Sequence, residues 1–520
     1  MNRLFYLFLI LFFITFFDSF SQYGYYKDVI KFSHSYRGGS ARIQSIGSAS
    51  TSLGGDISSI SNNPAGLGFF NKKIFSISYN NSSVKSTSNY FGTSRDAKSN
   101  FDGINNISFL FPLKKPYGYS LSRSDECPDC QKFNLGISYG TIKDFSNERF
   151  YRGYNDNNSI IDYFLNDAQG VPFSQISNSM PITGIGLLQE AYDHYLINPD
   201  NDLPGSYFSF IGGFPLQYEK IVNSGKISQF SISGGTNLKD KFFLGVGISI
   251  YSINYNQVRT YTESEFEILN NQLWEFEGIL DYLILKDHFK IYGSGASISG
   301  GIIIKPIDQL NIGFNYESKT KYSLKEELFN ELETKYFDYY FQPEDTVLGN
   351  AISGTVTNVS DYKFTSPSKL SIGSSYFFKK FGFISVDLDV INYTSSKIQS
   401  FDFNYYADNA EIKNRYKSLA VNYRLGIEGR YKNFYLRAGY NILSDPNKNA
   451  IESDIDNKII KKSLGFGYLS KKINLDIAYI FMSRESKIIP YPIYINQPIA
   501  NFSTNYKSLL LTLAVRINNR

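Results

Sequence analysis

Alternating apolar and polar residues recur along most of this 520-residue chain, and this pattern limits its possible folds most strongly. In Phe434–Asn441, Ile473–Tyr479 and Leu310–Glu317, every second side chain is apolar or aromatic. Because successive side chains of a β-strand point to opposite faces, each segment has one apolar face and one polar or small face. The chain is therefore predicted to fold mainly as two-faced β-strands.

Fourteen segments show this alternation, and several neighbours are separated by very short turns. Such turns occur near 238–241, 379–382, 431–433 and 470–472, whereas other connections, such as 327–363, are long and polar. An even strand number, with short turns at one end and long loops at the other, is typical of a transmembrane barrel. The predicted strands lie near 74–80, 104–112, 132–143, 227–237, 242–261, 289–305, 310–325, 368–379, 381–399, 418–431, 434–444, 462–471, 473–487 and 507–518.

A string of soluble β-sandwiches is the alternative architecture. The segment 242–261 is far longer than the usual strand of five or six residues. Polar faces that carry Arg437, Asp387 and Asp476 among many glycines suit a filled lumen. Closure removes exposed sheet edges and, in hydrocarbon, satisfies every backbone N–H and C=O group. The fold class is therefore predicted as all-β, an antiparallel transmembrane barrel of about fourteen strands.

Composition agrees with strands and excludes other classes. Tyr and Phe number 42 and 44, whereas charged residues make up only 19%. Aromatic and β-branched side chains suit a pleated surface, and this usage excludes coiled-coil, collagen-like and disulfide-rich chains. The net charge of +4 is evenly spread, so no basic stripe predicts nucleic-acid binding.

The first residues have the pattern of a secretory signal peptide. Arg3 gives a positive start, Leu4–Phe17 is a nearly unbroken apolar run, and small polar residues follow up to Ser21. This run is shorter than the roughly twenty residues that span a bilayer. Residues 1–21 are predicted to be cleaved, an uncleaved anchor being the alternative. An exported barrel is expected in the cell outer membrane.

Both cysteines lie in one C-x-x-C motif, Cys127 to Cys130. Redox activity would need a thioredoxin-like βαβ setting, and a structural zinc site would need a second ligand pair. In an exported chain the pair is interpreted as a small disulfide that tightens a loop.

The three histidines do not predict catalysis. His34, His194 and His288 lie outside any recognisable nucleophile motif, so the chain is predicted not to be an enzyme. Haem ligation by His34 or a tyrosine is a weaker alternative. No cofactor or metal site is expected.

Residues 145–205 are predicted to form a long extracellular insertion between strands. Segments 160–165 and 186–196 have the pattern of short amphipathic helices. Two interpretations are equally favoured: the helices pack over the barrel rim, or they form an apolar lid that captures a ligand. The ligand-capturing residues would be Leu187, Leu188 and Leu196.

Residues 22–72 precede the first strand and are rich in glycine and other small residues. Glycine permits close backbone approach, and Pro64 fixes its own φ. An irregular segment of this length cannot face lipid with unpaired backbone groups, so at membrane depth protein or water must surround it. We expect residues 22–72 to form a hatch inside a barrel built from residues 73–520.

Small-residue motifs in this region carry a family resemblance. Gly39–Arg42, Gly47, Ala49, Leu53-Gly54, Asp56 and Asn63–Leu67, in this order and spacing, resemble the N-terminal hatch of the FadL/TodX outer-membrane transport family. Weaker strand motifs extend the resemblance over nearly the whole mature chain, at 367–373, 423–428, 436–440, 463–468 and 475–479. The C-terminal residues 516–520 depart from the family pattern, because they lack a terminal aromatic residue.

The resemblance implies passive uptake of hydrophobic molecules, such as long-chain fatty acids or aromatic hydrocarbons. An extracellular apolar groove would capture the molecule, the hatch would shift, and a kinked strand would release it sideways into the bilayer. The implied partners are these molecules, outer-membrane lipid and lipopolysaccharide, with the protein as a monomer. The implied hatch and gating residues are Arg42, Gly54, Asp56, Asn63, Pro64, Ala65 and Gly66.

A protein-binding barrel is the rival function. FadL-like barrels are also similar to shuttle components of secretion systems, which hold exported proteins at the outer membrane. Such a barrel would use its rim loops as a protein interface. The long connections at 145–205 and 327–363 are compatible with either role.

Overall fold

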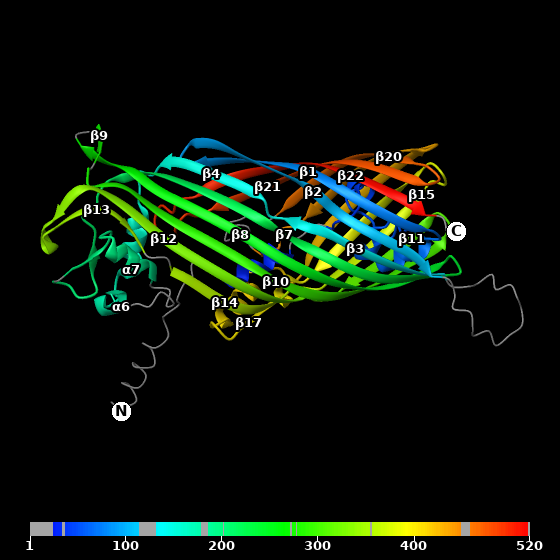
Figure 1. The fold of residues 1–520 in the computed structure, drawn as a ribbon, viewed down its shortest axis with the longest axis horizontal. Coiled ribbons are helices and arrows are strands. Elements are labelled where there is room, and N and C mark those ends of the chain that lie inside the picture. The colour runs from blue at the N-terminus through cyan, green and yellow to red at the C-terminus, as the bar shows by residue number, and fades with distance from the viewer. Residues whose placement is uncertain are drawn as a thin grey trace, which may run out of the picture.

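A single antiparallel sheet closes on itself into a fourteen-stranded barrel (Figure 1). Strand β22 (Ala500–Ile517) pairs along its length with β1 (Lys73–Tyr90), which closes the ring. The predicted fold class is thereby confirmed. The computed structural model describes residues 24–33, 37–113, 132–177, 186–200, 202–270, 273–276, 278–353, 356–448 and 458–517.

Ten of the fourteen strands are continuous, and four consist of two pieces in line. The continuous strands are β1, β2 (Thr93–Leu113), β7 (Phe214–Leu238), β8 (Phe242–Asn270), β10 (Leu280–Ile307), β18 (Ala420–Tyr431), β19 (Phe434–Leu443), β20 (Ile459–Leu469), β21 (Ile473–Ile488) and β22. The interrupted strands are β3 (Lys132–Asp144) with β4 (Asn147–Tyr154), β11 (Leu310–Glu317) with β12 (Lys321–Phe341), β15 (Lys369–Phe377) with β14 (Val356–Thr365), and β16 (Gly382–Ile391) with β17 (Lys397–Ser400). In each interrupted strand, both pieces pair with the same neighbouring strand. For example, β3 and β4 both pair with β7.

Two regions predicted to be loops contain strands instead. The connection predicted at 327–363 is the upper part of β12, the rim strand β13 (Thr346–Ile352) and most of β14. The start of the predicted insertion is β4. These strands were missed because their outer face is polar, with Lys286 paired to Glu331 at 2.7 Å and Lys290 to Glu327 at 3.5 Å across β10 and β12, while the buried side chains of β12, such as Leu332, face inward.

Outward-facing aromatic residues form two girdles, as in membrane barrels. One girdle lies beside the short turns, and the other lies about six to eight residues further along the strands. At about 3.3 Å per residue this spacing is about 20 to 26 Å along the tilted strands, so the apolar band between the girdles is somewhat less tall than the usual 25 Å or so. The first girdle contains Phe133, Phe242, Phe381, Tyr431, Phe434 and Tyr468, and the second contains Tyr79, Tyr139, Tyr316, Tyr423, Tyr440 and Tyr479.

Helices close the end of the barrel that is opposite the C terminus (Figure 1). The inserted helices α5 (Ile160–Ala168), α6 (Phe173–Ser177) and α7 (Gly186–Asp193), with the two-stranded sheet β5 (Asn198–Pro199) and β6 (Tyr207–Phe208), share a buried apolar cluster with β8, β10 and β12. The other rim elements are β9 (Leu273–Phe276), the 3-10 helices η4 (Gln342–Glu344) and η5 (Tyr393–Ser395), and α8 (Tyr406–Arg415).

Near the N terminus lie η1 (Tyr25–Lys27), α2 (Asp28–Ser33), α3 (Ala41–Ser45), α4 (Ser59–Asn62) and η2 (Pro64–Phe69). In the described part of the chain, no helix has the length and apolar character needed to cross a membrane.

Candidate functional site

Residues 37–70, called the N-terminal segment below, pack against the inner faces of strands all around the barrel. Helix α3 lies against β19 to β22, and η2 lies against β3, β7, β8 and β10. Strand side chains bind the backbone of the segment from several sides: the Nδ2 groups of Asn134, Asn311 and Asn441 donate to the carbonyl groups of Leu67, Ser52 and Gly47. The segment therefore fills the lumen at membrane depth.

Lumen-facing glycines make room for this segment. On nine strands, a Cβ atom added to the glycine would lie under 3.0 Å from an atom of residues 45–64. At Gly439 it would lie 1.9 Å from the backbone N of Gly47, and at Gly245 it would lie 2.2 Å from the carbonyl carbon of Pro64. We call these glycines the glycine seat: Gly136, Gly235, Gly245, Gly301, Gly313, Gly373, Gly426, Gly439 and Gly465.

The predicted hatch residues lie together in this segment. The Nδ2 group of Asn63 donates to the Thr51 carbonyl at 2.6 Å, and its Oδ1 accepts from the Ala65 N–H at 3.2 Å. Pro64 is the first residue of η2, where a missing N–H costs nothing. The Gly55 N–H donates to the Gly66 carbonyl at 3.3 Å, which holds the two glycine-rich turns against one another.

Arginines join the N-terminal segment to carboxylates of the barrel wall. The Nε of Arg42 lies 3.1 Å from Oε2 of Glu428, and Arg42 also pairs with Asp56 at 3.7 Å. Arg37 lies 3.3 Å from Asp389 and also binds Thr51. Arg37 was not predicted from the sequence, because an arginine beside two glycines follows no motif that indicates a buried partner.

The barrel wall opens beside the segment, between β2 and the interrupted strand β3–β4. The β2–β3 ladder runs from Leu113 only as far as Asn106, opposite Gly140. Both strands bulge there: Asn105 is skipped in the pairing with β1, and Ile142 in the pairing with β7. Tyr79 and Tyr139 of the second girdle lie beside this point. The opening therefore lies at the edge of the apolar band that is farther from the short turns.

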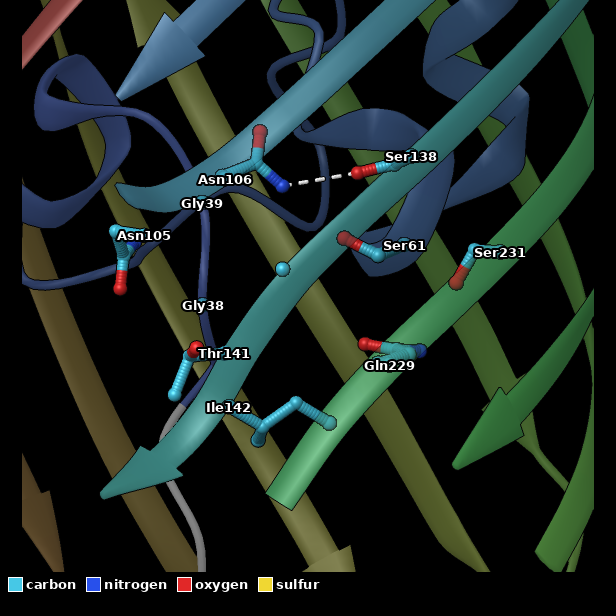
Figure 2. A pocket seen from close by; sticks show the side chains of 11 residues that line it. Gly38, Gly39, Ser61, Asn105, Asn106, Ser138, Thr141, Ile142, Gln229 and Ser231 are labelled. Atoms are coloured by element: carbon cyan, nitrogen blue, oxygen red, sulfur yellow. Dashed lines mark hydrogen bonds between the residues drawn. The ribbon is translucent and has the colours of Figure 1, made fainter. Parts of the chain in front are cut away.

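This break in the ladder, called the portal below, encloses only about 10 Å³, roughly the space of one water, and is lined mostly by polar groups (Figure 2). Asn105, Asn106 and Thr141 border it in the wall, with the Asn106 Nδ2 group donating to Ser138 Oγ at 2.9 Å. The inner side of the portal is formed by Gly38, Gly39 and Ser61 of the N-terminal segment and by Gln229 and Ser231 of β7.

The three predicted capture leucines lie in the rim cluster. Leu188 and Leu196 are buried, and Leu187 packs against the same cluster, so they form part of a closed apolar cap. The cap also buries polar groups: burial lowers the pKa of His194 to about 4, and its Nδ1 lies 2.8 Å from Thr334 Oγ1. Burial, with Asp287 and Asp193, raises the pKa of Glu190 to about 7.

The remaining predicted residues do not contribute to a described site. Cys127, Cys130 and His34 lie outside the described residues. His288 is exposed on β10, where its Nε2 lies 2.6 Å from Asn256 Oδ1. Within the described ranges, no three His, Cys, Asp or Glu side chains form a group that could hold a metal ion.

Comparisons with known proteins support the fold. No protein-family model and no curated protein matches this sequence. A FadL homologue of Pseudomonas aeruginosa superposes with a TM-score of 0.52 at 12% identity, over 93% of this chain and 99% of that chain.

The toluene transporter TodX of Pseudomonas putida superposes with a TM-score of 0.50 at 12% identity, over 93% of this chain and 100% of that chain. A deltaS2 mutant of the TodX monoaromatic hydrocarbon channel gives 0.52 at 13% identity, over 93% and 99%. At such identities the likeness is one of fold, so the resemblance noted in the sequence is confirmed at that level: this chain shares the barrel fold of the FadL homologue and TodX.

Proposed function

We propose that the protein is an outer-membrane channel for the uptake of hydrophobic molecules, such as long-chain fatty acids or aromatic hydrocarbons. The portal carries this proposal, because it breaks the wall at the surface of the apolar band and beside the segment that fills the lumen. A pore for polar solutes would need an open axis rather than a side opening. One protein of the same fold, TodX, is a toluene transporter, and toluene is an aromatic hydrocarbon.

The route begins at the rim and ends in the outer leaflet. Leu187, Leu188 and Leu196 take up the molecule when the helical cap loosens. An apolar chain gains roughly 0.8 kcal/mol for each CH₂ group that leaves water, so few polar contacts are needed to hold it. The molecule then passes above the N-terminal segment and leaves through the portal, which must widen from its volume of about 10 Å³, without crossing the whole lumen.

The N-terminal segment acts as the hatch in this proposal. Arg42, Asp56 and Asn63 hold it to the wall and to itself. The glycine seat fixes residues 45–64 by close contact with their backbone and side-chain atoms. Movement is expected in the part of the segment outside the glycine seat and beside the portal, residues 38–40, and it would break the hydrogen bonds of Gly38 with Asn62 and of Ser40 with Ser58.

Blocking the portal tests the side route. Thr141→Trp places a large side chain in the opening, whereas Tyr139→Trp on the same strand faces lipid and serves as control. In cells that lack other uptake proteins, uptake of radiolabelled hexadecanoate and toluene should fall at least fivefold for Thr141→Trp only. Unchanged uptake by both variants would contradict the side route.

Purification from native membranes in mild detergent tests the substrate class. Apolar molecules that are enriched over bulk lipid, and displaced by added hexadecanoate, would support uptake. A stoichiometric exported protein with no displaceable apolar molecule would instead favour the secretion-shuttle function.

A further inference from the structure

Four lysines gather on the outer face of the wall, on the strands β12, β14 and β17, which lie side by side (Figure 1). Lys321, Lys363 and Lys397 are exposed, and Lys325 is partly exposed. Both sequence neighbours of each lysine are buried. Because side chains alternate between the two faces of a strand, all four lysines point away from the lumen. We call these four residues the lysine patch.

Strand register places Lys363 at the centre of the lysine patch. Its partners on the two neighbouring strands are Ser323 and Gln399. Each of the other three lysines lies two positions from one of these partners, so each is a diagonal neighbour of Lys363. Diagonal neighbours across a sheet are roughly 7 to 8 Å apart. Four ammonium groups on flexible stems are therefore within reach of one large headgroup.

The lysine patch has an excess of positive charge. Asp361 lies opposite Lys325 in the ladder, and the Asp361 N–H donates to Asp402 Oδ2 at 2.6 Å, which brings a second carboxylate near. These two carboxylates face four lysines. Among the described residues, no ion pair within 4 Å joins any of the four lysines to a carboxylate.

The neighbouring carboxylates on the outer wall already have partners. Lys290 lies 3.5 Å from Glu327, the next outward residue after Lys325, and the Tyr292 hydroxyl donates to Glu327 at 2.8 Å. Glu331, further along β12, pairs with a lysine of β10 at 2.7 Å. Like charges that are neighbours in a sheet repel one another. An anion from outside the chain would therefore stabilise the lysine patch.

The lysine patch begins where the apolar band ends. Lys321 pairs with Ala296, and Ala296 pairs with Ile250, the last of the apolar outward residues that begin β8. On the membrane side of the patch, Tyr316 of β11 and Leu370 of β15 are exposed to lipid. The ammonium groups are therefore at the level of lipid headgroups, in the leaflet nearer the helical cap.

We propose that the lysine patch binds the phosphate groups of lipopolysaccharide in the outer leaflet. A lysine ammonium group binds phosphate as a point charge, and a cluster of four or more basic residues beside the apolar layer is typical of anionic headgroup recognition. Lipopolysaccharide carries several phosphates on one sugar headgroup, which suits four lysines around one centre. The exposed side chains of Ser323 and Gln399 can bind its sugar hydroxyls. This proposal rests on the outer-membrane location in the proposed function, but not on the uptake of apolar molecules.

The lipid bound in this way leaves the side route free. The strands β3–β4, β7, β8 and β10 separate the portal from β12. The headgroup therefore holds the barrel at a fixed height in the leaflet without covering the portal.

Binding of lipid A, the phosphorylated anchor of lipopolysaccharide, to the purified protein tests the patch. Lys363→Glu reverses the charge at the centre. Lys226→Glu is the matched control, because Lys226 is an exposed lysine in the same row across the wall as Lys325, with Asn254 and Asp144 as strand partners. Native mass spectrometry in detergent, with a chelator that removes divalent cations, gives the Kd for bisphosphorylated lipid A, monophosphorylated lipid A and phosphatidylglycerol.

We expect Lys363→Glu to weaken the binding of bisphosphorylated lipid A about tenfold or more, because a repulsion replaces an attraction, and Lys226→Glu to change it by less than about twofold. The wild type should bind monophosphorylated lipid A and phosphatidylglycerol more weakly than bisphosphorylated lipid A. Equal affinities of the wild type and Lys363→Glu, equal losses in both variants, or equal affinities for phosphatidylglycerol and lipid A would each overturn the proposal.

A second variant keeps the test decisive if Lys363→Glu does not fold. The double variant Lys321→Gln with Lys397→Gln removes two charges and keeps polar side chains at both positions. It should also bind lipid A more weakly, and unchanged binding by this folded variant would contradict the lysine patch.

Uptake measurements separate this proposal from the uptake function. Toluene uptake by cells that produce Lys363→Glu should equal that of the wild type. If the wild type binds lipid A through Lys363 but takes up no apolar molecule, the proposed uptake function fails while the lysine patch stands. Uptake by a wild type that binds no lipid A would overturn the lysine patch alone.

Discussion

At the scale of single residues, the glycine seat gives a sharp test of how tightly the N-terminal segment is held. A Cβ atom at Gly301 would lie 1.8 Å from Asn63 Oδ1, whereas one at Gly300 would meet nothing within 4 Å. Gly301→Ala must displace the Asn63 side chain and its hydrogen bonds, at about 2 kcal/mol. In gel electrophoresis of samples heated to increasing temperatures, Gly301→Ala should lower the temperature at which the band of the folded barrel disappears. Gly300→Ala should leave this temperature unchanged, and equal effects would contradict a tight seat.

Sequence patterns predicted some of these residues and not others. The roles of Asn63 and Pro64 could be predicted because they depend only on adjacent residues: Asn63 caps η2, and Pro64 is its first residue. Arg37 and Asp389 are 352 positions apart, and only barrel closure brings them together. The sequence showed the seat glycines as small residues within predicted strands. It did not show which atoms they contact, because those atoms belong to a distant segment of the chain.

At the scale of elements, we expect the packing of α7 in the cap to depend on pH. Burial, together with Asp287 and Asp193, raises the pKa of Glu190 from 4.5 to about 7. The packed cap binds more protons than the open one across this interval, so its stability falls as pH rises. Burial lowers the pKa of His194 from 6.5 to about 4. His194 therefore makes the packed cap more stable as pH rises, and this gain in stability is complete above pH 6.5. Of these two groups only Glu190 changes charge from pH 6.5 to 8, and its ionisation should loosen α7.

Hydrogen exchange of α7 checks this expectation. After correction for the intrinsic rate, amides of α7 should exchange at least threefold faster at pH 8 than at pH 6.5. Glu190→Gln should remove the difference, while Asp202→Asn, at an exposed carboxylate of the same insertion, should keep it. A pH difference that survives in Glu190→Gln would assign the effect to another group.

Element boundaries were predictable only where one strand face meets lipid. Within the apolar band, residues such as Val246 and Ile248 alternate with lumen-facing Gly245 and Gly247, and the predicted strands match. Above the band the outer face is polar, so upper β12 and β4 lack the lipid-facing apolar row that marks the lower strands. The physical cause is water outside the wall, whereas inside it Leu332 and Tyr336 of β12 pack against the helical cap.

At the scale of the whole molecule, the membrane should cover only the short-turn part of the barrel. On β8 the outward side chains from Phe242 to Ile250 are apolar, but those that follow begin with Ser252 and Asn254. The strand continues to Asn270, and at about 3.3 Å per residue its upper part extends well beyond a 25 Å band. This upper wall supports the helical cap in the aqueous layer outside the bilayer.

Fluorescence quenching by brominated lipids can locate this boundary. The single native tryptophan, Trp274, is first replaced by phenylalanine. Tryptophan is then placed at Val246, inside the apolar band, or at Asn254, eight positions further along the same outer face. Because bromine atoms quench only indoles within the acyl region, Val246→Trp should lose most of its emission and Asn254→Trp almost none. Strong quenching at both sites would mean that the bilayer covers the charged pairs of β10 and β12, which hydrocarbon would not tolerate.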